Sequence, residues 1–427
     1  MTTQSKNLIA RNGVFRNFLA ASSISLLGNN IFDIAIPLYI VQRTPDPMLL
    51  SWANIALTLP FFLMAPLTGF TVDNFNKRRV MLFSDIGQIF CLLLLLFYDL
   101  YGFSQFAPVL LLIFTAKTLM ITFETVSTFQ LVPALVSEAD LNEANSWFLS
   151  SQRLIQIFGP LIAGLLMSTS GIRACVIANM ISFLATLFFV TKLKNLNELI
   201  EGSEISSPRR KMTVGGVIDS FLSSVKYVWN SPLFKPFILM MFVWNLSALV
   251  PNTPSVVYYF TIEKKLSSTE YGSIASALGL IGILGFLISG KLYQKHFFYR
   301  PFVYGSVFFA SMGALSILFF DQPYVLAAIF SLSRIGSSIV TMGTFFLRQT
   351  HIPKSKMGGI NAALRMFFMS SAPLSALLQG FLIKGLGVRT SFVVGSIFLW
   401  LTVWYSKKVA LAYLAVTPKR SGTSKAA

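Results

Sequence analysis

Four ionisable side chains stand inside long apolar segments, where a charge without a partner is costly. They are Asp33, Lys117, Glu124 and Arg334. A charge at the centre of a bilayer costs at least about 2.5 to 3.5 kcal/mol on insertion scales, so such groups normally face a bundle interior or a water-filled cavity. We therefore predict that Asp33 and Glu124 are proton-coupling carboxylates. The two cations favour an anionic or carboxylate-bearing substrate.

A structural role is the alternative for these charges. Because buried ions are commonly paired, Asp33 or Glu124 would then pair with a cation and hold the helices together. Counting about 1.5 Å per residue puts Lys117 and Arg334 near the middle of the membrane. The same count puts Asp33 toward the outside and Glu124 toward the inside. Depth alone leaves both interpretations open.

Polar side chains accompany the charges at helical spacing. Lys117 and Glu124 are seven residues apart, so they lie on one face of a helix. The same spacing separates two amides of a later segment, beside two prolines that are expected to bend it. The candidate substrate-binding residues are Asn29, Asn30, Lys117, Asn245, Asn252 and Arg334.

Composition places the chain among membrane proteins. Of its 427 residues 54% are apolar and 12% charged, against roughly 45–50% and 25% in soluble proteins. Its net charge of +18 would suit nucleic acid in a soluble protein, but membrane proteins collect Lys and Arg in cytoplasmic loops. Cys91 and Cys175 lie in apolar runs, and neither histidine has a second ligand nearby. We expect no nucleic-acid partner, no metal and no other cofactor.

The apolar segments predict an all-α integral membrane protein with twelve transmembrane helices, at about 20 residues per crossing. The predicted helices are 18–41, 48–72, 80–100, 106–131, 142–167, 174–190, 237–260, 271–292, 302–320, 324–347, 361–386 and 391–405. They form two bundles of six, over residues 1–191 and 236–406. Residues 192–235 are a cytoplasmic linker in which 214–229 have the spacing of an interfacial helix, and 407–427 are a cytoplasmic tail.

The two bundles have the sequence signs of tandem copies. Asn145 precedes Gly164 by 19 positions, and Asn361 precedes Gly380 by the same number. Lys and Arg set the orientation, because only six of them fall in the alternate loops expected outside. Those six are Arg43, Arg173, Lys264, Lys265, Lys384 and Arg389. We therefore expect both termini in the cytoplasm. The low charge of the outside loops and their lack of glycosylation-style sequences favour the plasma (inner) membrane of a bacterial cell.

A short polar turn between the second and third predicted helices has a recognisable pattern. Gly69 is followed four residues later by Asp73 and then by the basic run Lys77, Arg78 and Arg79. This turn resembles the signature loop of the major facilitator superfamily. The resemblance implies a gating charge network, which Asp85 is expected to join. It also implies two pseudo-symmetric bundles whose first, fourth, seventh and tenth helices line a central cavity.

The fifth predicted helix has a second pattern. Gly159-Pro160 followed by Gly164 is similar to the antiporter signature of the same superfamily, in which a glycine face and a proline bend favour close helix packing. Arg153 on this helix reaches either the cavity edge or the cytoplasmic gate. With Leu131-Val132-Pro133 and the run 141–145, the chain resembles the macrolide-efflux and enterobactin-exporter branch. That resemblance implies export.

The function predicted from these patterns is secondary active transport. The chain has no G-x-x-x-x-G-K-[ST] loop for ATP and no cluster of catalytic side chains, so we expect no enzyme. We expect a monomeric, proton-coupled exporter of an amphipathic small molecule, either a carboxylate-bearing siderophore-like metabolite or a drug as in multidrug resistance. The alternative is an importer of a carboxylate or an iron chelate. A membrane enzyme or a non-transporting sensor is more remote.

Overall fold

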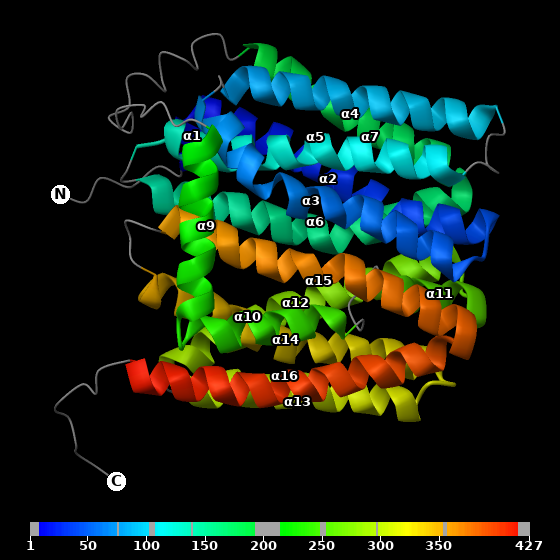
Figure 1. The fold of residues 1–427 in the computed structure, drawn as a ribbon. Helices are drawn as coiled ribbons and strands as arrows, with labels where there is room; N and C mark the ends of the chain where they lie inside the picture. Colours follow the sequence, from blue (N-terminus) through cyan, green and yellow to red (C-terminus); the bar gives the residue numbers. More distant parts are fainter. Residues whose placement is uncertain are drawn as a thin grey trace. The chain divides into compact units, whose positions relative to one another are not determined.

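A computed structural model describes residues 8–74, 77–101, 107–137, 140–192, 214–247, 253–295, 298–352 and 357–416. These ranges are helical, with no strand among them (Figure 1). The N-terminal helices are α1 (Leu8–Arg11), α2 (Gly13–Arg43), α3 (Pro47–Asn74), α4 (Lys77–Leu100), α5 (Ala107–Ala134), α6 (Leu141–Thr169) and α7 (Gly171–Lys192). The six long helices coincide with the six predicted in this half.

The described residues of the second half of the chain form nine further elements. They are α9 (Val214–Asn230), α10 (Phe234–Leu246), α11 (Pro254–Tyr258), the π-helix η3 (Tyr259–Glu263), α12 (Ser268–Lys295), α13 (Tyr299–Leu318), α14 (Pro323–His351), α15 (Met357–Leu386) and α16 (Val388–Val416). Within the described ranges, 11 helices are long and apolar enough to cross a membrane.

Two boundaries differ from the prediction. The segment expected as one helix over 237–260 contains two helices, α10 and α11, and residues 248–252 between them lie outside the described part. The last helix was expected to end at residue 405 but continues to Val416. Apolar packing extends it, because Val409 and Ala410 are fully buried and the Tyr413 ring lies 4.4 Å from that of Phe298.

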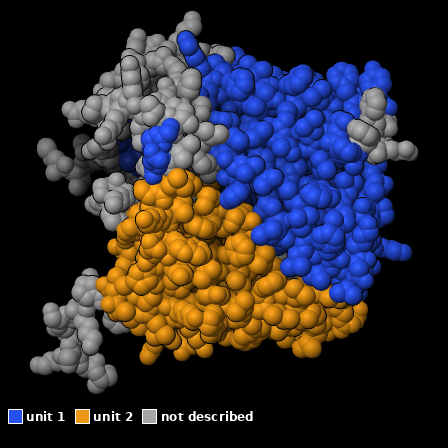
Figure 2. Space-filling view, in the orientation of Figure 1, with its two compact units in different colours: residues 1–219, 250–280, 372–388 blue, residues 220–249, 281–371, 389–427 orange. Residues whose placement is uncertain are grey.

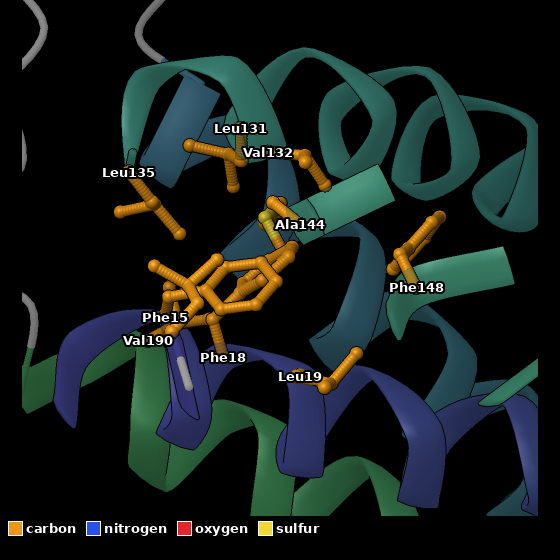
Figure 3. Close-up of a cluster of buried hydrophobic side chains, with 11 residues drawn as sticks. Phe15, Phe18, Leu19, Leu131, Val132, Leu135, Ala144, Phe148 and Val190 are labelled. Atoms are coloured by element: carbon orange, nitrogen blue, oxygen red, sulfur yellow. The ribbon is translucent and has the colours of Figure 1, made fainter. Parts of the chain in front are cut away.

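The chain groups into two compact units, coloured separately in Figure 2. Unit 1 contains residues 1–219, 250–280 and 372–388, and unit 2 contains residues 220–249, 281–371 and 389–427. In unit 1, α2 packs against α6 and α7, while α4 and α5 pack against each other. A buried apolar cluster closes this unit near the start of α2, where Phe18 stacks on Phe148 with centroids 6.5 Å apart (Figure 3).

Unit 2 is organised around the pair α13 and α14. Trp244 of α10 stacks on Phe309 of α13, with ring centroids 4.6 Å apart. Helix α9 runs across the direction of α13, α14 and α16 (Figure 1), and Trp229 near its end stacks on Phe367 of α15. The amphipathic segment predicted over 214–229 is therefore a helix that packs on unit 2 by its aromatic end.

Ion pairs hold both ends of unit 1. Near the start of the chain, Arg11 of α1 pairs with Asp140 in the turn before α6. The Ser137 hydroxyl donates a hydrogen bond to Asp140, and Arg11 adds a second hydrogen bond and a positive charge. Together they hold the pKa of Asp140 below its usual value. At the opposite end, the Asp99 carboxylate is 3.2 Å from Arg43 and 2.7 Å from Arg173. These contacts tie α1, α2, α4 and α7 to their neighbours.

Candidate functional site

Unit 1 encloses a cavity of about 350 Å³, a size typical of small-molecule sites. Side chains of α2, α3, α5 and α6 make most of its wall. Met81 and Phe148, which belong to the apolar cluster of Figure 3, line the cavity at the end nearest the chain's start. The polar lining includes Asn29, Asp33, Asn54, Thr118, Glu124 and Gln152.

Asp33 and Glu124 line this cavity together. Asp33 is exposed, Glu124 is 9% exposed, and both side chains contribute to the cavity wall. The two carboxylates come from different helices, α2 and α5. The structure therefore brings both predicted proton-coupling candidates to one water-accessible space.

Lys117 is held behind the cavity wall. It is 1% exposed and is not among the lining residues, while its Nζ donates to Asn29 Oδ1 at 2.9 Å. The ammonium also lies 4.2 Å from the centroid of the Phe32 ring. Asp33 and Glu124 act on it electrostatically, but it forms no direct ion pair with a carboxylate of the described residues. Its role in substrate binding stays a prediction, acting through Asn29.

Glu124 is held by neutral donors. Gln88 of α4 donates its amide to Glu124 Oε2 at 2.7 Å, and the Ser25 hydroxyl donates to Oε1 at 3.0 Å. Close packing of α4 and α5 makes this possible, because a Cβ built on Gly87 would lie 2.8 Å from the sulfur of Met120. The side chains around Glu124 therefore stabilise it without an ion pair.

Asp85 lies one turn before Gln88 on α4 and is fully buried. Within the described part of the chain, both of its carboxylate oxygens lack a hydrogen-bond donor, and so does Gln88 Oε1. Glu124 acts on Asp85 electrostatically. Its predicted place in the gating network is untested, because the side chains of Gly69, Asp73, Lys77 and Arg78 lie outside the described part of α3 and α4.

Unit 2 contains Arg334 and Asn245. Arg334 of α14 has a buried guanidinium, and it forms no ion pair with a carboxylate within the described ranges. The Asn245 amide donates to the backbone carbonyl of Phe368 at 2.6 Å, which fixes α10 against α15. Asn252, the third candidate from this half, lies outside the described residues.

The glycine face of α6 packs closely within unit 1. A Cβ on Gly164 would lie 2.5 Å from the Ser268 carbonyl and 3.0 Å from the Gly272 Cα, so α6 and α12 touch through their backbones. Gly159 faces Asn30, which contacts α6 and is not among the cavity-lining residues. Pro160 lies inside the helix between these contacts.

Arg153 bonds within its own helix. Its guanidinium donates to the Gln156 side chain at 2.9 Å, while neighbouring Gln152 lines the cavity.

Sequence reasoning missed Gln88, Ser25 and Asp99. Gln88 has a detectable signal, since it follows Asp85 at helical spacing in an apolar segment, but pairing it with Glu124 requires knowing how α4 meets α5.

The comparisons with known proteins agree with the fold. The family model described as Major Facilitator Superfamily matches residues 18–375. The structure resembles that of a bacterial homologue of the iron transporter ferroportin in its inward-facing state, with a TM-score of 0.74 and 19% identity. The alignment covers 93% of this chain and 98% of that one.

Several curated relatives of low identity are efflux proteins. The multidrug efflux pump Tap of Mycolicibacterium fortuitum is 23% identical, over 87% of this chain and 89% of Tap. The macrolide efflux protein A of Streptococcus pyogenes is 24% identical, over 66% and 67% of the two chains. The enterobactin exporter EntS of Shigella boydii is 24% identical, over 91% and 89%. The predicted resemblance to the macrolide-efflux and enterobactin-exporter branch is confirmed.

Proposed function

Because the chain belongs to the Major Facilitator Superfamily, and is a membrane transporter rather than an enzyme, we propose that it is a proton-coupled exporter of an amphipathic, carboxylate-bearing small molecule. The observation that carries this proposal is the cavity that Asp33 and Glu124 line together. The efflux relatives support the direction of transport.

Proton coupling follows from the chemistry of the cavity. Each carboxylate can bind a proton from cavity water, and binding removes a charge that is costly inside a bilayer. Protons entering from outside return the transporter to the state that loads substrate from the cytoplasm. Moving one charge across about 100 mV supplies roughly 2.3 kcal/mol, which is enough to drive accumulation about fiftyfold.

The cations support an anionic substrate. Lys117 polarises Asn29, whose side chain lines the cavity, and Arg334 brings a second positive charge without a carboxylate partner among the described residues. A siderophore-like metabolite suits this arrangement better than a cationic drug, and one relative is named as an enterobactin exporter. Export of drugs, as in the relative named as a multidrug pump, is the second candidate.

The proposal includes the setting of the transporter. Basic residues concentrated in alternate loops support a plasma-membrane location in a bacterial cell, with both termini in the cytoplasm. The internal repeat supports two six-helix bundles over 1–191 and 236–406, and one such chain is sufficient to form a transport path, so we propose a monomer.

The test is mass spectrometry of cell extracts and spent medium from wild-type and deletion strains, grown with and without iron. An exporter's substrate accumulates inside the deletion strain and is depleted from its medium. The opposite pattern, in which a compound persists in the medium and is missing from the cells, would establish the importer alternative. Complementation with the intact gene is the control.

A further inference from the structure

Three buried acceptor atoms of α4 have no hydrogen-bond donor among the described residues. They are Asp85 Oδ1, Asp85 Oδ2 and Gln88 Oε1. A buried acceptor without a donor costs about 1–3 kcal/mol, and more when it is charged. Three such atoms from residues one helical turn apart therefore indicate that a positive species belongs among them.

Glu124 of α5, unlike Asp85, already has hydrogen-bond donors. Each of its carboxylate oxygens already accepts a hydrogen bond, one from Gln88 and one from Ser25. Donors of this kind offset part of the cost that burial imposes on the ionised form of Glu124. Asp85 interacts electrostatically with Glu124, so ionising both groups would put two negative charges together in a buried place.

We propose that Asp85, Gln88 and Glu124 form one proton-binding unit, in which Asp85 holds the proton in the conformation described and Glu124 is the ionised partner that exchanges it with the cavity. This inference rests on the proposed proton coupling and adds Asp85 to it. A protonated carboxyl becomes a donor, so one proton supplies the donor that Gln88 Oε1 lacks. Gln88 then bridges the two carboxyl groups.

The position of the two carboxyl groups gives them different roles. Glu124 lines the cavity and so meets water, whereas Asp85 is fully buried and does not line it. A proton therefore enters and leaves through Glu124. If a conformational change removes the hydrogen bond from Ser25 or Gln88, Glu124 becomes the better proton acceptor, and the proton moves from Asp85 to Glu124 and then to water.

Helices α4, α5 and α7 contribute further charged groups near this unit. Lys117, two turns earlier on α5, is the cation that acts on Glu124. On α4 itself, Arg79 is exposed and lies almost two turns before Asp85. Helix α7 also packs on α4, and its ionisable Arg173 binds Asp99 at the far end of that helix. Lys117 is therefore the main modulator of where the proton rests.

The test is infrared spectroscopy of the purified, reconstituted transporter, because a protonated carboxyl has a C=O stretching band that a carboxylate lacks. We expect Asp85→Asn to remove one such band at neutral pH, while Asp219→Asn, a change at an exposed aspartate of α9, removes none. Glu124→Gln should change the pH at which the Asp85 band disappears. In a Gln88→Leu background, Glu124→Gln should change that pH less. Gel filtration confirms that each variant is folded.

Two results would overturn the inference. One is an identical carboxylic-acid region in wild type and Asp85→Asn at every pH. The other is a carboxylate band of Asp85 that shifts on adding Na⁺ or Ca²⁺, since a metal cation would then occupy the place assigned to the proton.

Transport into liposomes driven by a pH gradient separates the two proposals. An Asp85 band without proton-driven transport refutes the proposed function alone, and driven transport without the band refutes this inference alone.

Discussion

At the scale of single residues, unit 1 holds its buried ions in two different ways. Asp99 is paired directly with Arg43 and Arg173, whereas Glu124 and Lys117 are held by amides and a hydroxyl. Breaking a fully buried pair costs about 3–5 kcal/mol, and the cost at Asp99 is smaller because both guanidinium groups are half exposed. Neutral partners avoid that cost when a group gains or loses a proton. The Asp99 cluster is therefore suited to a fixed role, and the Glu124 environment to a changing charge.

The carboxylates of the cavity give the first prediction. Asp33→Asn and Glu124→Gln remove the group that binds the proton but keep its shape and much of its hydrogen bonding. We expect transport driven by a pH gradient in liposomes to fall to the level of passive equilibration, while substrate binding measured by calorimetry changes little. Asp219→Asn on the exposed face of α9 is the control. Uphill transport that persists in both cavity variants would contradict the assignment.

The cations give the second prediction. A hydrogen bond to a charged group is worth about 1.5–3 kcal/mol, or about ten- to hundredfold in affinity. Lys117→Ala and Arg334→Ala should weaken transport of an anionic substrate by about this factor and that of a neutral analogue much less. Lys235→Ala, which removes a cation resting over Trp229, should spare both. Equal losses for the anionic and neutral compounds in the Lys117→Ala and Arg334→Ala variants would argue against an anionic substrate.

At the scale of elements, the packing of α6 against α12 depends on a contact between their backbones at two glycines. The hydrogen atoms of Gly164 and Gly272 allow two backbones to meet, and a methyl group at Gly164 would press on the Ser268 carbonyl, which has no freedom to move aside. Gly380, the tandem counterpart of Gly164, lies instead against side-chain atoms of Ser51 and Met48 of α3. Both glycines therefore stand at close helix contacts, but only Gly164 meets another backbone.

Substitution of Gly164 therefore gives the third prediction. Overpacking costs typically about 1–3 kcal/mol, so Gly164→Ala should lower the melting temperature and reduce transport. Gly282→Ala on α12 is a matched control, because a Cβ there has open space and alanine favours a helix by about 1 kcal/mol. Differential scanning fluorimetry in detergent measures both. A Gly164→Ala variant at least as stable as Gly282→Ala would show that α6 and α12 can separate without loss.

The anchor of α1 gives the fourth prediction. Asp140 has a lowered pKa because of Ser137 and then Arg11, so its stabilising effect is present above the ordinary aspartate pKa and is lost as the pH falls through the lowered value. Protection factors of the amides of Leu8–Arg11 in hydrogen exchange should follow that loss. Asp140→Asn should remove the pH dependence. Ser137→Ala should move it to higher pH, and an unchanged midpoint would contradict the assigned cause.

At the scale of the whole molecule, the sequence predicts crossings better than contacts. Apolar length and breaking residues located the long helices, because each crossing must satisfy its own backbone in lipid. Charges in apolar segments likewise located Asp33 and Glu124. Asn30 and Lys117 show the limit of this reasoning. Spacing tells which face of a helix they share, but only packing decides that Asn30 meets Gly159 and that Lys117 lies behind Asn29.

The orientation of the chain gives the last prediction, because a basic excess in alternate loops is a statement about the whole molecule. Cys91 and Cys175 are buried, so Cys91→Ala with Cys175→Ala provides a background without thiols. In that background, Ser170→Cys between α6 and α7 should react in intact cells with a thiol reagent that cannot cross membranes. Asn230→Cys at the end of α9 should react only after the membrane is opened. Both positions are exposed, so access to solvent is matched between them. Labelling of Asn230→Cys but not Ser170→Cys in intact cells would invert the topology, and would place α1 and the Asp140 anchor outside the cell.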